Sequence, residues 1–375
     1  MTQAFDVCIR GDGIVGRALA LLLAREHLRV GLVASRTAAP QATVSPGADV
    51  RAYALNAKSK ALFESLRCWP DALHATAVLN MEVQGDAGGA VTFCAADLGV
   101  PGLAWIVDVP ALEARLAQAL RFQAQIELLQ APAPAALSVI CEGKASAARA
   151  AFGIEFDVTP YAQSAIAARL SCAAAHHQVA RQWFAQGEIL AFLPLGGPQG
   201  DSVAVVWSVA QAHAQTLLGA SELEFCQQLE HASGLCLGSL ALTGERQAWP
   251  LQLARARRFA GVHQGQAWAL AGDAAHTVHP LAGQGLNLGL ADVQALVDVL
   301  HQREYWRSVG DEKLLRRYER ARQAPALALG LATDGLQRLF AQPGVVWQTV
   351  RNWGMSGFEH SAAIKHWVAR QAMNG

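Results

Sequence analysis

Residues 5–34 decide the fold; they read FDVCIRGDGIVGRALALLLAREHLRVGLVA. The apolar run 5–9 and the run 29–34 have the pattern of buried strands, and the residues between them have the apolar spacing of a helix. The first turn of this βαβ unit carries GxGxxG. In such turns Gly11 makes the tight bend, Gly13 lets backbone N–H groups approach a pyrophosphate, and Gly16 allows the helix to pack closely on the strand. The stretch predicts a dinucleotide-binding domain, with an ordinary α/β turn as the alternative.

The end of the second strand departs from this pattern. The acidic residue that normally binds the ribose of a dinucleotide should lie roughly 20 residues after the glycines, but the chain has Ala34, Ser35 and Arg36 there. We expect Ser35 or Arg36 to contact the adenosine end of the cofactor instead.

A second glycine-rich segment lies at 268–293 and reads WALAGDAAHTVHPLAGQGLNLGLADV. Its apolar start predicts a buried strand, and residues 289–300 have helical apolar spacing. The loop between them is poor in side chains, and such a loop lets a ligand approach the backbone. His276 and His279 lie in it, but two histidines without an acidic or cysteine partner make a poor metal site. We therefore expect hydrogen-bonding histidines and no metal.

Composition excludes several classes of protein. The chain has 375 residues, 52% of them hydrophobic and 16% charged, and its 30 basic and 30 acidic residues cancel. A balanced charge argues against a nucleic-acid-binding protein. The 7 cysteines are scattered without metal-ligand spacing, as in a reducing compartment. With no signal-peptide pattern and no apolar run of membrane-spanning length, we expect a cytoplasmic protein.

The middle of the chain changes character. Residues 131–136 resemble a linker, and the runs 162–170, 177–184, 188–195 and 201–209 are extended and separated by turn signals. They predict a mainly antiparallel sheet. After residue 292 the pattern is mostly helical.

Many segments in the same order resemble the flavin-dependent aromatic hydroxylases related to para-hydroxybenzoate hydroxylase, and most closely the ubiquinone-biosynthesis hydroxylase branch. They are GDGIVG at 11–16, DVRAYALN at 49–56, CEGKASAAR at 141–149, YAQSAI at 161–166, GDAAHTVHPLAGQGLNLGLADV at 272–293, YERAR at 318–322 and ATDGLQRLF at 332–340.

The resemblance implies an α/β fold: a Rossmann-like FAD-binding domain with an inserted antiparallel-sheet substrate domain and a helical C-terminal region. The expected boundaries are 1–75, 101–158 and 259–335 for the FAD-binding domain, 76–100 and 159–258 for the substrate domain, and 336–375 for the C-terminal segment.

The resemblance also implies the cofactor site. Asp273 would bind the ribityl chain of the flavin, Arg51 would lie close to the flavin, and the backbone of 283–287 would approach its pyrimidine edge, at the N-terminus of a helix beginning after Gly285. Pro280 would lie at the ring face. The residues expected to contact FAD are Gly11, Gly13, Ile14, Val15, Gly16, Ser35, Arg36, Arg51, Asp273, Pro280, Gly283, Gly285, Leu286 and Asn287.

Three assignments stay open. Arg51 has a second interpretation as an ordinary surface arginine. Phe192 is either a substrate-side wall, like Pro280, or part of the sheet core. Glu142 stands where the family commonly has aspartate, which with Ala34 puts cofactor affinity in question. No catalytic acid or base is assigned, because the flavin carries the chemistry.

The implied reaction uses FAD, NADPH or NADH, and dioxygen to hydroxylate a small hydrophobic aromatic substrate, in this branch a polyprenylated phenol of ubiquinone biosynthesis. The alternatives are a flavin monooxygenase with another aromatic or lipid substrate, and a non-catalytic assembly subunit with weakened FAD binding. The C-terminal segment mixes tryptophans with basic residues. It suggests peripheral contact with the inner membrane or a biosynthetic complex; a helix packed on the core is the alternative.

Overall fold

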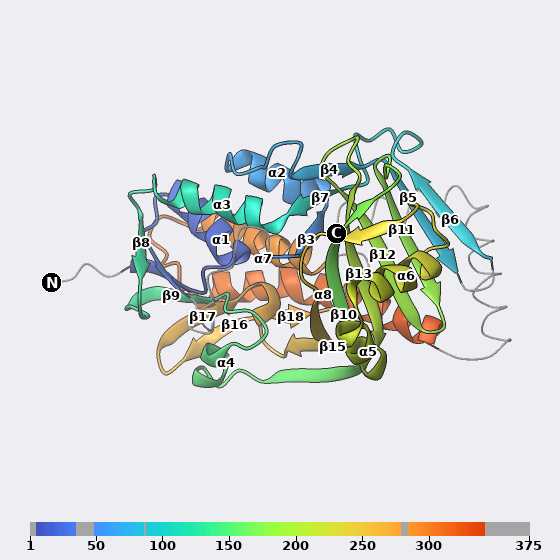
Figure 1. The fold of residues 1–375 in the computed structure, drawn as a ribbon. Coiled ribbons are helices and arrows are strands. Elements are labelled where there is room, and N and C mark those ends of the chain that lie inside the picture. The colour runs from blue at the N-terminus through green and yellow to red at the C-terminus, as the bar shows by residue number, and fades with distance from the viewer. Residues whose placement is uncertain (1–4, 35–48, 86–87, 279–283, 342–375) are drawn as a thin grey trace.

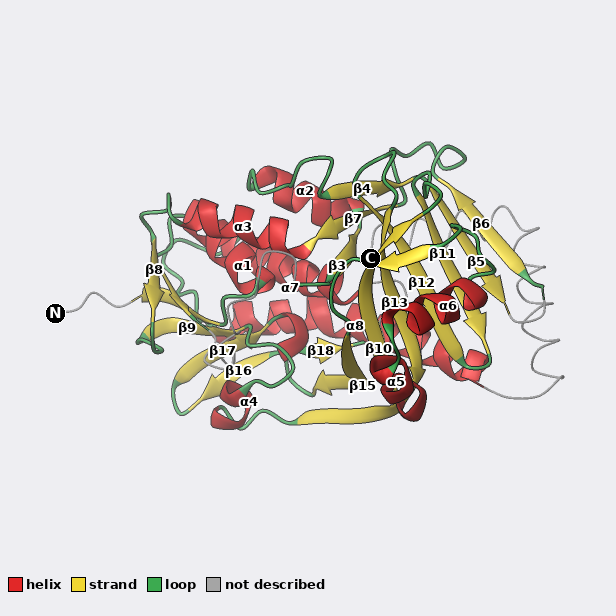
Figure 2. Cartoon of the chain, in the orientation of Figure 1, coloured by secondary structure: helices red, strands yellow, loops and turns green. Residues whose placement is uncertain are grey.

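The computed structural model describes residues 5–34, 49–85, 88–278 and 284–341. Figure 1 shows two halves side by side, a helix-rich half with the N-terminal strand and a half dominated by a large sheet. The segments that build the helix-rich half come from both ends of the chain, and the large sheet is formed mostly by the middle of the chain (Figure 2).

The helix-rich half contains a six-stranded sheet. In spatial order its strands are β16 (Ala260–His263), β17 (Gln266–Leu270), β9 (Ala135–Ile140), β1 (Phe5–Arg10), β2 (Val30–Val33) and β8 (Ile126–Leu129). All neighbours are parallel except β16 and β17, which form a hairpin.

Four helices pack in this half. They are α1 (Ile14–Arg25), α3 (Val109–Leu120), α7 (Gln284–His301) and α8 (Glu312–Ala341), and α1 contacts both α3 and α7. The α1 sequence is rich in Ala and Leu from Ala18 to Ala24, and most of its residues are buried, because it lies between the sheet and two other helices. The short helix α4 (Ala147–Ala151) follows β9.

The second half is built on a nine-stranded sheet. Its strands, in spatial order, are β18 (His276–Thr277), β15 (Gln247–Ala256), β10 (Phe156–Cys172), β13 (Ser202–Ala210), β12 (Glu188–Leu195), β11 (Val179–Ala185), β5 (Asn80–Gly85) and β6 (Ala90–Cys94), and β14 (Leu240–Leu242) pairs with β10. Pairing is antiparallel except between β5 and β11. The helices α5 (Gln211–Gly219) and α6 (Glu222–Ala232) cover one face, where apolar side chains form a separate core.

A small third sheet joins the halves. It consists of β3 (Ala52–Leu55), β7 (Ala104–Asp108) and β4 (Ala75–Val78), with α2 (Ala57–Ser65) after β3. The antiparallel sheet and the parallel unit confirm the predicted fold class. The strands β11, β12 and β13 agree with the predicted runs to within two residues, whereas β10 begins six residues earlier than predicted. The domain boundaries stay a prediction.

Candidate functional site

Three described loops meet at one edge of the six-stranded sheet. Because β1, β9 and β17 are parallel neighbours, the segments that follow them, beginning at Gly11, Cys141 and Ala271, lie side by side. The crevice outside the carboxyl ends of the strands is where open α/β sheets bind ligands. Both glycine-rich motifs of the sequence therefore lie at the same edge.

The first glycine turn is packed as tightly as the motif requires. Gly11 has φ of +108°, and a Cβ on it would lie 2.5 Å from the carbonyl oxygen of Cys141. A Cβ on Gly16 would lie 1.9 Å from the carbonyl oxygen of Gly11. Gly13 differs, because a Cβ there would have no neighbour within 4 Å. The space above Gly13 can therefore receive a ligand.

The N-terminus of α1 points toward this space without a cap. Gly13 is the N-cap residue, no side chain accepts a hydrogen bond at this end, and the first turn holds no acidic residue. Ile14 is buried in the core, and Val15 contacts Gly272. Only the backbone N–H groups of these two residues are placed to serve a ligand, and an uncapped helix N-terminus favours an anion such as a pyrophosphate.

Asp273 follows β17 in a single turn of 3-10 helix, Gly272–Ala274. Its carboxylate accepts no hydrogen bond from any residue that the structure describes. Burial raises the pKa of Asp273, although the positive charges of Lys144, His276 and Arg149 lower it. Asp273 is half-buried. A carboxylate that loses water contacts without gaining a partner is costly, and hydroxyl donors of a ligand would satisfy it. This unpaired acceptor fits the ribityl chain of a flavin.

Arg149 ties the turn after β9 to the turn after β17. Its guanidinium donates to the carbonyl oxygens of Gly143 (3.4 Å), Lys144 and Ala274 (3.1 Å). It is buried and stacks on the ring of Phe156 at 3.7 Å. Arg149 belongs to the motif at 141–149, but the sequence does not indicate its role. Its hydrogen-bond acceptors are backbone carbonyl groups, which a pattern of side chains cannot reveal.

The Glu142 carboxylate is occupied within its own loop. It accepts hydrogen bonds from the Ser146 hydroxyl (2.8 Å) and the backbone N–H of Ala148 (3.0 Å). The side chain of Glu142, which is longer than the aspartate that the family commonly has here, therefore supports the start of α4. It acts next to Ser146, the N-cap residue of that helix.

Arg51 is part of a charged cluster that the sequence did not predict. Its guanidinium contacts the carboxylates of Asp49 (2.5 Å) and Glu113 (3.5 Å), and the hydrogen bonds that it donates to Asp49 raise its pKa. Tyr53 follows Arg51 by two residues on β3. Burial raises the pKa of Tyr53, the positive charge of Arg51 lowers it, and the negative charge of Asp273 raises it further.

Arg169 connects the large sheet to the small one. It donates to Asp108 Oδ2 (2.5 Å) and to the carbonyl oxygen of Arg51 (3.1 Å). The face of the large sheet that carries Arg169 therefore lies against the small sheet, at β3 and β7. Asp108 also caps α3 through the N–H of Ala111, and Pro110 lies in the first turn of the helix.

Phe192 points to the other face of that sheet. It is 1% exposed, contacts Trp183 edge-on at 5.2 Å, and belongs to the core under α5 and α6. Of the two interpretations that the sequence left open, a substrate-side wall and part of the sheet core, the structure supports the second. Its neighbour Leu193 alternates to the opposite face and packs in the cluster between the sheets.

The side chain of Asn287 is fully engaged by the protein. It donates to the carbonyl oxygen of Ala54 (2.8 Å) and accepts from the backbone N–H of Asn56 (3.0 Å) and the hydroxyl of Ser59 (2.7 Å). Only its backbone remains for a cofactor.

The helix that carries Asn287 begins earlier than predicted. Gly285 and Leu286 lie in the first turn of α7, which begins by Gln284 and not after Gly285. The hydrogen bonds of Asn287 to β3 and to the start of α2 hold the first turn of α7 in place, which explains why the helix already includes Gly285 and Leu286. Leu286 packs on the core, and a Cβ on Gly285 would meet nothing within 4 Å.

Several predicted residues lie outside the described ones. They are Ser35, Arg36, His279, Pro280 and Gly283, together with the C-terminal segment from residue 342. His276 is described and hydrogen-bonds to Asp292 at 2.7 Å, which confirms its predicted hydrogen-bonding role. Within the described ranges, no three His, Cys, Asp or Glu side chains gather in a way that could hold a metal ion.

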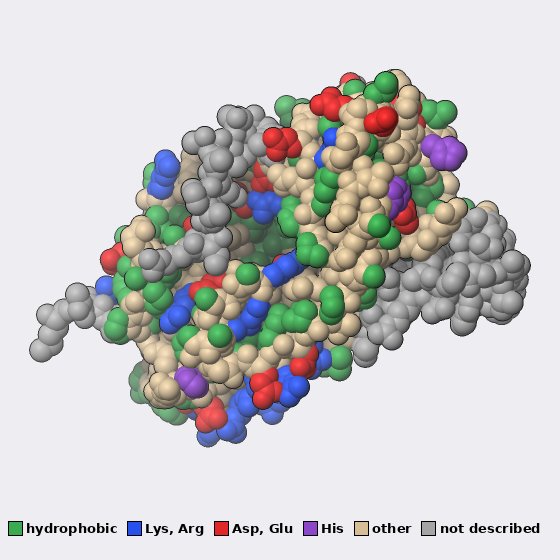
Figure 3. Space-filling view, turned by 60° about the horizontal axis from the view of Figure 1, so that its bottom comes forward, with side chains coloured by type: hydrophobic (Ala, Val, Ile, Leu, Met, Phe, Trp, Pro, Cys, Tyr) green, Lys and Arg blue, Asp and Glu red, His purple; other side chains and the backbone are tan. Residues whose placement is uncertain are grey.

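The surface is hollowed between the two halves. Figure 3 shows a hollow with hydrophobic side chains inside and Lys and Arg side chains around it. Thr277 lies at this seam: β18, immediately after the Asp273 turn, pairs with β15 of the large sheet, Ala254 opposite Thr277. The turn that carries Asp273 therefore lies at the junction of the two sheets.

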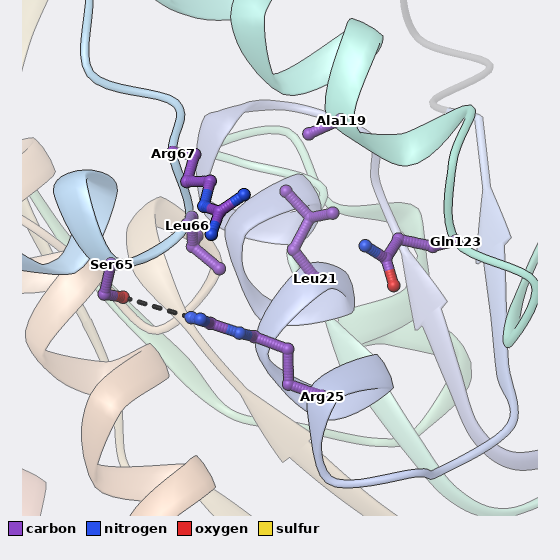
Figure 4. A pocket seen from close by; sticks show the side chains of 7 residues that line it. All are labelled: Leu21, Arg25, Ser65, Leu66, Arg67, Ala119 and Gln123. Carbon is purple, nitrogen blue, oxygen red and sulfur yellow. Dashed lines mark hydrogen bonds between the residues drawn. The ribbon is translucent and has the colours of Figure 1, made fainter.

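A separate pocket of about 250 Å³ lies far from these loops (Figure 4). Its lining includes Arg25, Arg67, Ser65 and Gln123, and Arg25 hydrogen-bonds to Ser65. Arg25 is at the opposite end of α1 from the glycine turn, about 17 Å away at 1.5 Å per residue. Arginines at the C-terminal ends of α1 and α2 balance the helix dipoles, so the pocket needs no ligand to explain its charge.

Comparison with known proteins identifies the type of domain. A family model described as FAD binding domain matches residues 130–330. The chain is 28% identical to 3-demethoxyubiquinol 3-hydroxylase of Escherichia coli, over 99% of each chain, and 28% identical to ubiquinone hydroxylase UbiL of Rhodospirillum rubrum, over 98% of this chain and 89% of that one.

Solved structures show the same fold. The crystal structure of p-nitrophenol 4-monooxygenase PnpA from Pseudomonas putida aligns with a TM-score of 0.77 at 17% identity, over 100% of this chain and 99% of that one. No helix in the described ranges is both long and apolar enough to cross a membrane.

Proposed function

The chain belongs to the FAD-binding domain family, and from this premise we propose that it is an FAD-dependent hydroxylase of aromatic rings that uses NADPH or NADH and dioxygen. The observation that supports this most is the half-buried carboxylate of Asp273, which has no described hydrogen-bond partner and lies at the sheet edge where the uncapped α1 begins. A pyrophosphate and a polyhydroxyl chain in one ligand would satisfy both.

The residues present fit FAD. The N–H groups at the start of α1, beside Gly13, would hold the pyrophosphate, and Asp273 would accept hydrogen bonds from the ribityl hydroxyls. The backbone of Gly285 to Asn287, at the N-terminal end of α7, would donate to the pyrimidine edge of the ring, where the positive end of the helix dipole stabilises negative charge. Bound FAD would supply the redox chemistry: it takes a hydride from NAD(P)H and activates dioxygen. Pro280 and Gly283 remain proposed contacts.

The protein's own contribution is to position the ring and exclude water. We place the substrate between the Asp273 turn and the face of the large sheet that carries Arg169 and Leu193. Apolar packing on this face would exclude water from the reacting atoms.

We propose that the substrate is a polyprenylated phenol of ubiquinone biosynthesis. The E. coli relative is named for 3-demethoxyubiquinol hydroxylation and the R. rubrum relative for ubiquinone hydroxylation, and both align over nearly the whole chain. The hydrophobic interior of the hollow in Figure 3 suits an apolar aromatic ligand.

The test is incubation of the full chain with FAD, NADPH, a prenylated phenol and ¹⁸O₂. The proposal predicts a hydroxylated product that carries one ¹⁸O atom, and loss of this product in Asp273→Asn. NADPH oxidation that yields only hydrogen peroxide with every prenylated phenol tried would contradict the substrate class. An unlabelled product would contradict the monooxygenase reaction.

We further propose that the C-terminal segment contacts a membrane surface. Trp347, Trp353 and Trp367 alternate with basic residues there, a composition typical of interfacial segments. Replacing these three tryptophans with serine in the full chain should reduce co-sedimentation with anionic lipid vesicles. Trp306→Ser, at an exposed tryptophan in the described part of the chain, is the matched control. Equal sedimentation of the two variants would contradict the proposal.

A further inference from the structure

Asp292 on α7 lies directly beneath the turn that carries Asp273. One of its carboxylate oxygens, Oδ2, accepts the backbone N–H of Gly272 (2.9 Å) and contacts Nε2 of His276 (2.7 Å). Asp292 is 0% exposed and His276 is 3% exposed. A single oxygen thus holds both ends of the five-residue segment 272–276.

The second oxygen of Asp292 is held by α8. Arg322 Nε donates to Oδ1 at 2.7 Å, and its Nη2 donates to the carbonyl oxygen of Leu288 at 3.3 Å. Burial on its own would raise the pKa of Asp292, but the charges and hydrogen bonds of His276 and Arg322 keep it below its usual value. The ionised carboxylate can only accept. His276 therefore donates from Nε2.

Asp273 itself has nothing else to fix its side chain. No described residue hydrogen-bonds to its carboxylate, so its position depends on the backbone of its turn. That backbone is constrained at Gly272, where φ is +67° and a Cβ would lie 3.2 Å from Val15, and at the carbonyl oxygens that Arg149 binds. The bonds to Asp292 close the remaining side of the turn.

We infer that Asp292, held in place by Arg322, is a positioning residue that aims the Asp273 carboxylate at the cofactor. The inference rests on the proposed function, since it assumes that Asp273 binds FAD. It adds a role for two residues that touch no cofactor themselves. A buried charge pair next to a ligand-binding turn can fix one geometry out of several.

The same helix offers a matched control. Glu319, one turn away from Arg322 on α8, is also an acid bound by an arginine and by a backbone N–H: its Oε1 accepts from Arg258 (2.8 Å) and from the N–H of Phe259 (2.9 Å). These contacts secure the strand region before β16. No hydrogen bond joins Glu319 to the described residues 272–276, although the ring of Phe259 lies 5.7 Å from that of His276. We therefore expect Glu319→Gln to lower stability without changing the hydrogen bonds that fix the Asp273 turn.

The experiment measures the FAD dissociation constant of the full chain for Asp292→Asn, Glu319→Gln, Asp273→Asn and the double variant Asp292→Asn/Asp273→Asn. Melting temperatures are measured in parallel. We expect Asp292→Asn to weaken FAD at least about tenfold, as loss of a charged hydrogen bond would, and Glu319→Gln to leave FAD affinity unchanged. If Asp292 acts through Asp273, the double variant binds FAD no more weakly than Asp273→Asn alone.

Additive losses in the double variant, or an equal loss in Glu319→Gln, would overturn the inference in favour of a general effect on stability. If Asp292→Asn does not fold, Arg322→Lys takes its place in the cycle, because it keeps the charge and changes only the geometry.

A measurement without cofactor separates the two proposals. Amide hydrogen exchange of residues 270–278 in the apo chain should accelerate in Asp292→Asn more than in Glu319→Gln; unchanged exchange would overturn the positioning role. Full FAD affinity in Asp273→Asn would instead overturn the assignment of the cofactor site.

Discussion

Gly16 lies so close to Gly11 that a Cβ on Gly16 would be 1.9 Å from the Gly11 carbonyl oxygen. The contact joins α1 to the end of β1 and leaves no room for any side chain. We predict that Gly16→Ala destabilises the fold by more than about 3 kcal/mol, since the backbone itself must move. Urea unfolding of the apo chain measures this; a variant as stable as the parent would show that the turn is looser than described.

Gly13 has the opposite environment and is the matched control. Its φ of −70° and ψ of −177° suit any L-residue, and a Cβ would meet no protein atom within 4 Å. We expect Gly13→Ala to change the stability of the apo chain by less than about 0.5 kcal/mol. FAD affinity should fall at least about tenfold, because the methyl group occupies the approach of the pyrophosphate. Unchanged affinity in a calorimetric titration would place the pyrophosphate elsewhere.

Asp273→Asn should stabilise the apo protein while weakening FAD. Burial raises the pKa of Asp273 above its ordinary value of 3.8, so the folded state disfavours the ionised form. The destabilisation by Asp273 is absent below that ordinary value and grows as the pH rises toward the folded-state pKa. The stability gain of the variant should therefore be smallest near pH 4 and grow as the pH rises. A gain independent of pH, in urea unfolding from pH 4 to pH 8, would be inconsistent with a half-buried carboxylate that ionises.

Asn287→Ala should cost stability as well as cofactor affinity. It removes three buried hydrogen bonds that tie α7 to β3 and to the start of α2, worth about 2 to 4 kcal/mol together. Gln294→Ala is the control on the same helix, because its side chain is exposed and bonds only to Asp298. Equal melting temperatures for the two variants would contradict the anchoring role of Asn287.

The sequence predicts the parts of this protein that depend on local pattern. The βαβ unit follows from Gly11 to Gly16, and the strands of the large sheet follow from their alternating apolar residues. The Asp273 turn could be placed on a strand end because a glycine-rich loop follows an apolar run. The contacts between distant segments could not be predicted, since Arg169 with Asp108 and Arg322 with Asp292 are separated by 61 and 30 residues.

Phe192 shows that the sequence also does not determine which face of a strand a residue occupies. Its strand is evident from the sequence, but both faces of β12 are apolar, so alternation does not say which face meets the α5 and α6 core and which meets the small sheet. Asn287 shows a further limit of sequence analysis. The motif indicates that this residue matters, but not whether its side chain binds the cofactor or holds α7 to the rest of the protein.

The most direct test is the visible absorption spectrum of the purified full chain during titration with FAD, followed by NADPH with and without a prenylated phenol. We predict a saturable change in the flavin bands, which requires more protein in Gly13→Ala and Asp273→Asn. We also predict that NADPH bleaches the flavin bands faster when the phenol is present. A folded chain whose addition leaves the flavin spectrum unchanged would contradict these predictions.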